Sequence, residues 1–226
     1  DTLSIHTSPS QQVNITSYNF TPKFILMNMK VPTQWSEITI GKYQDLISLE
    51  KSNDIIQQEI QILSALTGEP ESMFEDMSVE DLKGLISKTA FLTDLPNSKK
   101  IPKSIKVAGK KFTINLMISD LSGGQYIDLM TLTKDGGKVI EKMHEILAIF
   151  IHPMERRFFM WMPVPYSGDK HRDTADFLKK NLTMDVAYPI AIFFCLLYEN
   201  LMAGIQDYFL KKADKEMAKA KRILKK

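Results

Sequence analysis

The chain has 226 residues, which is enough for one large domain or two small ones around a substantial hydrophobic core. Apolar residues make up 44% and charged residues 25%, as in ordinary globular proteins, and a formal net charge of +2 by itself gives no argument for a polyanionic partner. The charge is uneven, because residues 211–226 hold eight Lys/Arg and two Asp/Glu. A mildly acidic body therefore precedes a basic tail.

Cysteine usage and hydropathy disfavour two further classes of protein, the disulfide-bonded secreted proteins and the membrane-spanning proteins. Cys195 is the single cysteine, so an internal disulfide is excluded, and we expect a buried, inert thiol. The first residues do not read as a secretory signal peptide. The longest apolar run, 187–198, is interrupted by Pro189 and is shorter than the about 20 residues that span a bilayer. We expect an intracellular, soluble protein without a membrane partner.

Residues 1–28 are interpreted as an extended N-terminal arm. Ser, Thr, Gln and Asn dominate its first 23 positions, and such a composition buries too little surface to fold alone. A short strand is plausible at 24–29. The arm's apolar side chains need a surface to receive them, and they are our first candidates for a protein interface: Val13, Ile15 and Phe20.

The most informative pattern is an internal repeat. Residues 38–70, aligned without gaps to 121–153, share eight identities in 33 positions, where ordinary residue usage gives about two. In each copy a first helix is followed by a polar turn and a second apolar-periodic helix, which is expected to stop at Pro70 or Pro153. The pattern favours duplication of one helical unit.

Matching helix starts support the repeat. Ser122 with Gln125 three positions later is a capping box, and Thr39 repeats the capping residue in the first copy. A third helix is expected to begin after Ser78 in one copy and after Thr183 in the other. The sequence therefore predicts two three-helix units, residues 29–100 and 119–210.

Alternating apolar residues on both sides of Gly109 predict a β-hairpin within residues 101–118, between the two units. The fold class is therefore α+β and predominantly helical. Two pseudo-repeated three-helix units are joined by the hairpin, and an extended N-terminal arm and a basic C-terminal helix flank them.

An insert at 154–170 is the least ordinary segment of the second unit. Two adjacent arginines are followed there by aromatic and methionine side chains, and prolines interrupt the stretch. Three interpretations stay open, namely packing on the core, a protein interface, or stacking on nucleic-acid bases. The interface candidates of this insert are Arg156, Phe158, Phe159, Trp161 and Tyr166.

The basic tail, 211–226, completes an apolar seam at helical spacing whose interface candidates are Leu210, Met217 and Leu224. A helix of two heptads is marginal alone, so the seam is expected to meet a partner. The nucleic-acid candidates, which are not favoured over solvated charges, are Lys211, Lys212, Lys219 and Arg222.

Catalytic motifs are not evident in the sequence. We find no phosphate-binding loop with the required spacing and no Gly-x-Ser-x-Gly elbow. A metal or acid–base site around His144, between Glu141 and Glu145, is an alternative to ordinary helix-surface charge, and His171 is read as part of a solvated loop. We expect no enzyme, no cofactor and no catalytic or metal-binding residue.

Several segments resemble proteins encoded in the structural gene clusters of tailed bacteriophages of gut bacteria, the crAss-like phages. The segments are Trp35–Tyr43, the helix that contains Asp128-Leu129, and Ile146–Ile149 running to Pro153, within about residues 29–200. The resemblance implies a non-enzymatic virion component near the portal, tail or capsid interior, made in the host cytoplasm. Its implied partners are other phage structural proteins in a homo-oligomer or ring. The alternatives are a tail assembly chaperone absent from the mature particle and a nucleic-acid-binding module.

Overall fold

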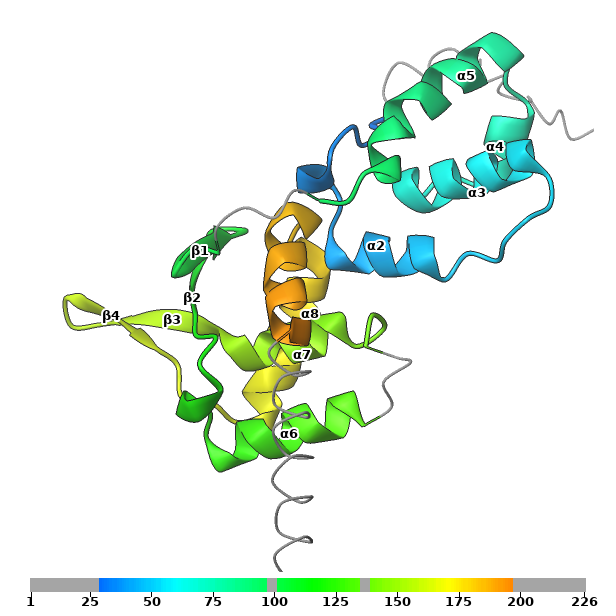
Figure 1. Ribbon diagram of the computed structural model, residues 1–226. Helices are drawn as coiled ribbons and strands as arrows, with labels where there is room; N and C mark the ends of the chain where they lie inside the picture. Colours follow the sequence, from blue (N-terminus) through cyan, green and yellow to red (C-terminus); the bar gives the residue numbers. More distant parts are fainter. Residues whose placement is uncertain (1–28, 97–100, 135–138, 197–226) are drawn as a thin grey trace, which may run out of the picture. The chain divides into compact units, whose positions relative to one another are not determined.

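The computed structural model describes residues 29–96, 101–134 and 139–196, and the account that follows concerns these residues (Figure 1). The described residues from Val31 onward belong to one compact unit. The N-terminal arm, nearly all of the expected strand 24–29 and the basic tail lie outside the described residues. So do their interface and nucleic-acid candidates, Val13, Ile15, Phe20, Leu210, Lys211, Lys212, Met217, Lys219, Arg222 and Leu224.

The α+β class is confirmed, with helices combined with a four-stranded antiparallel sheet in the described part of the chain. A further helix, without a label, occupies residues 184–196. Among the described residues, no helix has the length and apolar character needed to cross a membrane. The labelled elements are η1 (Trp35–Glu37), α2 (Ile40–Ile47), α3 (Ile55–Thr67), α4 (Glu71–Glu75), α5 (Val79–Lys88), η2 (Thr89–Thr93), β1 (Ser104–Val107), β2 (Lys110–Ile114), η3 (Ile118–Asp120), α6 (Gly123–Thr133), α7 (Met143–Phe150), β3 (Ile151–Arg157), β4 (Met160–Pro163) and α8 (Gly168–Asn181).

The expected helix starts are confirmed. The Thr39 hydroxyl accepts a hydrogen bond from the Lys42 backbone N–H at 3.4 Å, which begins α2. Ser122 accepts from the Gln125 N–H, and the Gln125 side chain accepts from the Ser122 N–H at 3.0 Å, which completes the capping box of α6. Ser78 caps α5 in the same way. Each cap satisfies a backbone donor that the first helical turn leaves unpaired.

The predicted hairpin at 101–118 is also confirmed. Strands β1 and β2 are joined by Ala108 and Gly109, both with positive φ (42° and 81°), as a tight two-residue turn requires. The sheet order is β1-β2-β3-β4, so β3 pairs with β2 along its first residues and with β4 along its last.

Two expectations about the second unit are wrong. Helix α7 ends at Phe150 and not at Pro153, which lies within β3 opposite Phe112 of β2. Because the first residues of β3 pair with β2, the chain is already a strand where it reaches Pro153. The expected solvated loop around His171 is α8, whose N-terminus is capped by Ser167. Most residues of this helix are polar or charged, and its buried residues are Thr174, Ala175 and Leu178. The helical periodicity of apolar residues is therefore weak in the sequence.

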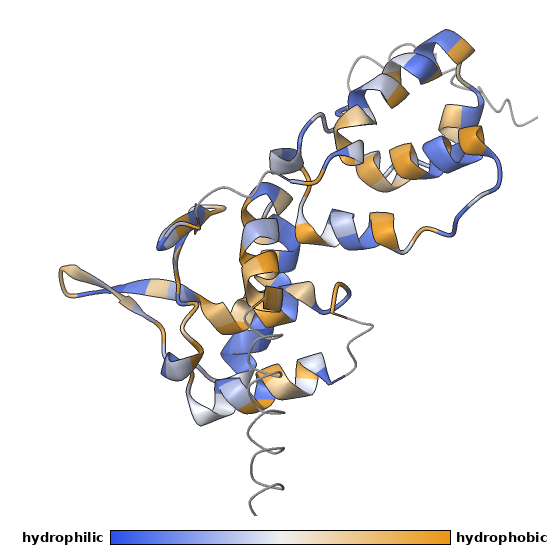
Figure 2. Cartoon of the chain, viewed as in Figure 1, coloured by the Kyte–Doolittle hydropathy of each residue, from blue (hydrophilic) through white to orange (hydrophobic). Residues whose placement is uncertain are grey.

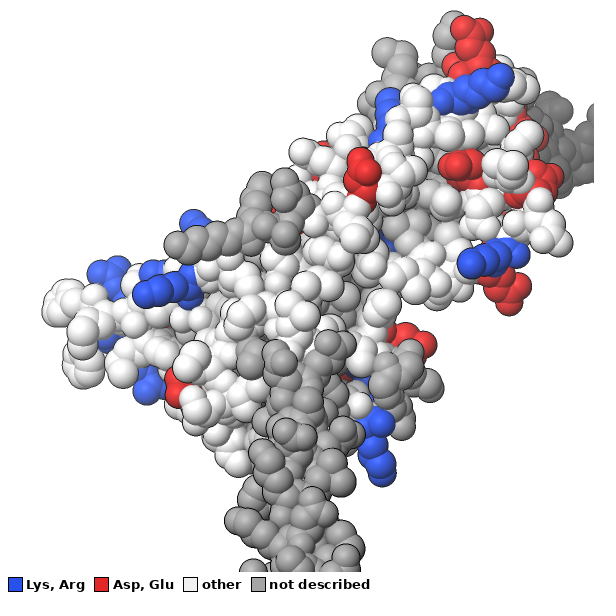
Figure 3. Space-filling view, viewed as in Figure 1, with Lys and Arg blue, Asp and Glu red and all other residues white. Residues whose placement is uncertain are grey.

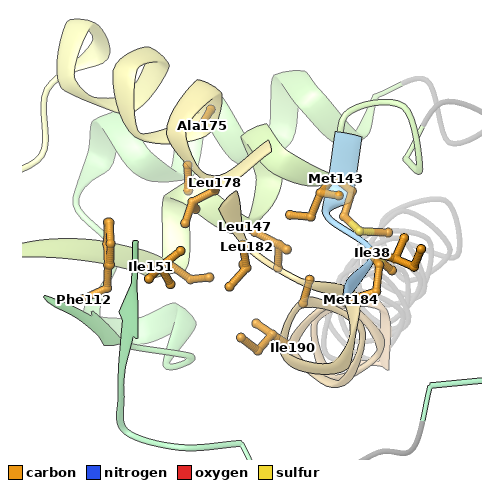
Figure 4. Close-up of a cluster of buried hydrophobic side chains, with 14 of the residues drawn as sticks. Ile38, Phe112, Met143, Leu147, Ile151, Ala175, Leu178, Leu182, Met184 and Ile190 are labelled. Atoms are coloured by element: carbon orange, nitrogen blue, oxygen red, sulfur yellow. The ribbon is translucent and has the colours of Figure 1, made fainter. Parts of the chain in front are cut away.

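The main hydrophobic core joins side chains from both predicted units and from the sheet (Figure 4). Phe112 and Ile151 come from strands, Leu147 from α7 and Leu178 from α8. In Figure 2 the end of α7 is coloured hydrophobic where it runs into β3, whereas the first turns of α8 are largely hydrophilic. A smaller cluster lies around Leu129, Ile146, Ile149, Phe150 and Phe194, beside half-buried Cys195.

Backbone hydrogen bonds connect the beginning of the first unit to the last described helix. The Ile40 N–H donates to the Leu182 carbonyl at 3.0 Å, and the Met184 N–H donates to the Ile38 carbonyl at 2.8 Å. Thr39 and Thr183 form the antiparallel bridge between these bonds. The two sequence units therefore share one core and one short backbone ladder.

Candidate protein-interaction site

The β3–β4 hairpin is the candidate functional site. Its strands pair antiparallel from Met154 opposite Pro163 to Arg157 opposite Met160, which leaves Phe158 and Phe159 as the two turn residues. The base of the hairpin is held by β2 and by a hydrogen bond from the Val164 N–H to the Pro153 carbonyl at 2.8 Å. Val164 is buried, whereas all four residues of β4 are exposed.

The turn has an unfavourable backbone conformation. Phe158 has a φ of 55°, in the left-handed region where hairpin turns usually place glycine or asparagine. A bulky side chain there is an outlier that costs about 1–2 kcal/mol. Glycine would remove this cost, so the aromatic side chain at the tip is unfavourable for the local backbone.

The tip presents five consecutive apolar residues to solvent, Phe158 to Met162, here called the hairpin tip. Phe158 is 95% exposed and Phe159 is 91% exposed, and Met160, Trp161 and Met162 are between 46% and 67% exposed. The interpretation that this part of the insert packs on the core is therefore wrong. Because β3 pairs with β4, the side chains of the hairpin tip lie outside the hydrophobic core, although their apolar character is typical of core residues.

Basic side chains lie beside the hairpin tip, which is itself uncharged (Figure 3). Arg156 is exposed and lies opposite Trp161, and Arg157 approaches Glu155 at 3.6 Å. The Lys111 ammonium lies 5.3 Å from the centroid of the Trp161 ring, at cation–π distance. Lys111 and Trp161 also line a cleft of about 530 Å³. Aromatic, methionine and arginine side chains together have the composition that is enriched at protein interfaces.

Tyr166 does not share the exposure of the hairpin tip. It is half-buried, and its hydroxyl donates a hydrogen bond to Asp128 Oδ2 at 2.5 Å. Burial, assisted by this bond, raises the pKa of Tyr166. Its ring centroid lies 5.6 Å from that of His171. The structure thus separates Tyr166, which ties the end of the insert to α6, from the four other candidates of the insert.

A polar cavity of about 540 Å³ brings together side chains that the sequence left apart. Asp128, His144, Glu145, His171 and Arg172 are among its lining residues. His144 is not surface charge, because its side chain is 12% exposed and its Nδ1 lies 3.1 Å from Gln44 Nε2. Within the described ranges, no three His, Cys, Asp or Glu side chains are placed to hold one metal ion.

Both of the other described histidines are held by the fold. His171 Nε2 lies 2.8 Å from the Glu145 carbonyl oxygen, which secures α8 to α7. His152 Nε2 lies 3.3 Å from Gln125 Nε2. These contacts join residues 26 to 27 positions apart along the chain. No motif spacing could have revealed them.

We expect the free energy of unfolding to decrease as the pH falls from about 7.5 to about 5.5. Burial lowers the pKa of His144 and of His152 below the ordinary value of 6.5. For His144 the nearby Lys179 adds to this effect, whereas Glu145 opposes it. The unfolded chain then binds protons near pH 6.5 that the folded chain does not, so acidification favours unfolding.

Urea unfolding at several pH values in this window measures the effect. The double variant His144→Gln/His152→Gln should show a flatter dependence than the wild-type chain. An equal slope in the two proteins would contradict the assignment of the pH dependence to these histidines.

The chain was compared with protein-family profiles, with curated protein sequences and with solved structures, and none of the three comparisons gave a match.

Proposed function

We propose that this chain is a non-enzymatic structural protein of a tailed bacteriophage, which assembles with other virion proteins near the portal, tail or capsid interior. The observation that carries the proposal is the hairpin tip, five exposed apolar residues on a strained turn. The viral setting comes from the resemblance of residues 29–200 to phage structural gene products.

The energetics of the tip favour a protein partner. Fully burying a side chain such as Phe158 or Phe159 contributes about 1.5–3 kcal/mol, and neither side chain obtains it within the chain. A hairpin is already ordered, so docking it requires less loss of conformational entropy than docking a disordered segment. The tip therefore has the properties of an anchor residue cluster that fills an apolar pocket on another protein.

We expect the double variant Phe158→Gly/Phe159→Ser to be incorporated into particles about tenfold less than the wild-type chain, the change that ~1.4 kcal/mol of lost contact energy produces. Both side chains are almost fully exposed, so the fold should be retained. Glycine also relieves the positive φ at position 158, so thermal stability should not decrease. Quantitative mass spectrometry of purified particles measures incorporation.

Two controls make this experiment specific. Ile127→Ser removes another exposed apolar side chain, on α6 and outside the hairpin, and should be incorporated normally. A wild-type chain that is present during assembly but absent from purified particles would identify a tail assembly chaperone instead. Normal incorporation of the hairpin variant would contradict the proposed role of the tip.

A nucleic-acid-binding module is the second candidate, from a different class. The four strands and their turns, residues 103–114 and 151–163, hold six Lys/Arg and one Glu. Exposed aromatic rings beside basic groups can stack on single-stranded bases. Binding of a labelled single-stranded oligonucleotide, weakened by salt and by Trp161→Ala, would favour this function over assembly.

We also propose that residues 38–70 and 121–153 derive from one duplicated helical unit, and that residues 1–28 form an extended arm. Thr39 and Ser122 accept hydrogen bonds from the third residue after them, at 3.4 and 3.3 Å, which supports a common helix start. The copies then diverge, because the first continues into α4 and the second into β3.

A further inference from the structure

We propose that copies of this chain associate head to tail, with the hairpin tip and basic strands of one copy on the acidic helices α2–α5 of the next. The inference rests on the proposed function, since it names a partner for the same hairpin. A second copy of the chain is the proposed partner, because the chain itself carries a surface whose charge and exposed apolar residues complement those of the hairpin.

That surface is formed by α2 to α5, residues 40–88, here called the acidic helices. It contains ten Asp/Glu and four Lys. Acidic side chains over α3 to α5 are visible in Figure 3. Exposed apolar residues lie among these charges, with Ile55 79% exposed and Ile56 60% exposed at the beginning of α3. Ile47, at the end of α2, is 47% exposed.

The two surfaces match in charge and in apolar character. The strands carry a basic excess around an aromatic tip, and the acidic helices carry the opposite charge around exposed isoleucines. Opposite potentials favour association and fix its orientation. The apolar side chains of both surfaces are largely exposed, so the described part of the chain does not bury them.

Charge limits how two copies can associate. A contact of either surface with the same surface of a second copy would bring like charges together. A head-to-tail contact pairs unlike surfaces and repeats, so that it closes into a ring or continues as a filament. Each copy then uses both surfaces at once.

Two variants of the full chain test this arrangement. The tip variant, Phe159→Ser/Arg156→Glu, removes an aromatic anchor and reverses a charge on the hairpin. The acidic-helix variant, Ile55→Ser/Glu50→Lys, does the same on the other surface. All four side chains are exposed, and Asp54, which caps α3, is left in place. Circular dichroism of each variant checks that the fold is retained.

Sedimentation velocity of the purified chain is expected to show concentration-dependent species larger than a dimer, weakened at about 0.5 M salt. Each variant alone should be monomeric where the wild-type chain associates. Their equimolar mixture should form a one-to-one dimer and no larger species, because one intact surface of each kind remains. Together with species larger than a dimer in the wild-type chain, this outcome is specific to a head-to-tail contact.

Three results would overturn the proposal. They are a wild-type chain that is monomeric or stops at a dimer at all concentrations, a dimer formed by either variant alone, and a mixture that does not associate. Binding of the monomeric wild-type chain to anionic phosphatidylserine vesicles, lost in the tip variant, would assign the hairpin to a lipid surface instead. A monomeric chain whose incorporation into particles still depends on the hairpin would leave the proposed function standing and refute self-association alone.

Discussion

Leu147→Ala is expected to lower the free energy of unfolding by about 2–5 kcal/mol. Leu147 lies on α7, is 0% exposed, and belongs to the core cluster that includes Ile151 of β3, Leu178 of α8 and Leu182. Truncation to alanine removes the favourable free energy of burying the leucine side chain. It also leaves a cavity, which the close-packed neighbouring elements cannot collapse to fill. The loss approaches the whole stability of an ordinary domain.

Chemical denaturation measures this loss, and two controls bracket it. Leu147→Met keeps the side-chain volume and should cost less than about 1.5 kcal/mol. Ile127→Ala, at a position that is 65% exposed on α6, should change stability by about 0.5 kcal/mol or less. Equal losses for Leu147→Ala and Ile127→Ala would mean that α7 does not occupy the centre of the core.

Gln125→Ala is expected to have the second largest effect, a loss of about 2–4 kcal/mol. The Gln125 side chain is buried and accepts from the Ser122 N–H in the capping box. It also donates to the Ile149 carbonyl at 2.9 Å, near the end of α7. Alanine removes half of the capping box and leaves a buried carbonyl without this donor, so two separate costs add.

Ser122→Ala separates these two costs. It removes the hydroxyl that accepts from the Gln125 N–H but leaves the bond from the Gln125 side chain to Ile149, so its cost should be about 1 kcal/mol. Urea unfolding of both variants measures the difference. Indistinguishable losses would show that the contact with Ile149 contributes little to stability.

Local chemistry made part of the fold predictable from the sequence. The Ser122 capping box and the turn at Gly109 depend on residues within three positions of one another, and both are present. The same holds for the N-cap Ser78. Such features need no knowledge of the rest of the chain, because the partners are already neighbours.

Features set by distant partners were not predictable. Helix α8 was missed because its charged first turns resemble a loop until α7 covers Ala175 and Leu178. His144 is largely shielded from solvent, and it contacts Gln44, which lies 100 positions away in the chain. The aromatic insert was recognised as unusual, but its exposure follows from β3 pairing with β2, which the sequence expectation of a helix stop at Pro153 had excluded.

The passage from α7 into β3 also determines how a force on the hairpin is transmitted. The last residue of α7, Phe150, is followed at once by Ile151, the first residue of β3, and both side chains are buried. Because no loop separates α7 from β3, the hairpin and α7 should rotate together as one rigid body. A partner that binds the tip therefore fixes the orientation of the core as well as its position. Later steps of assembly then cost little further rotational entropy.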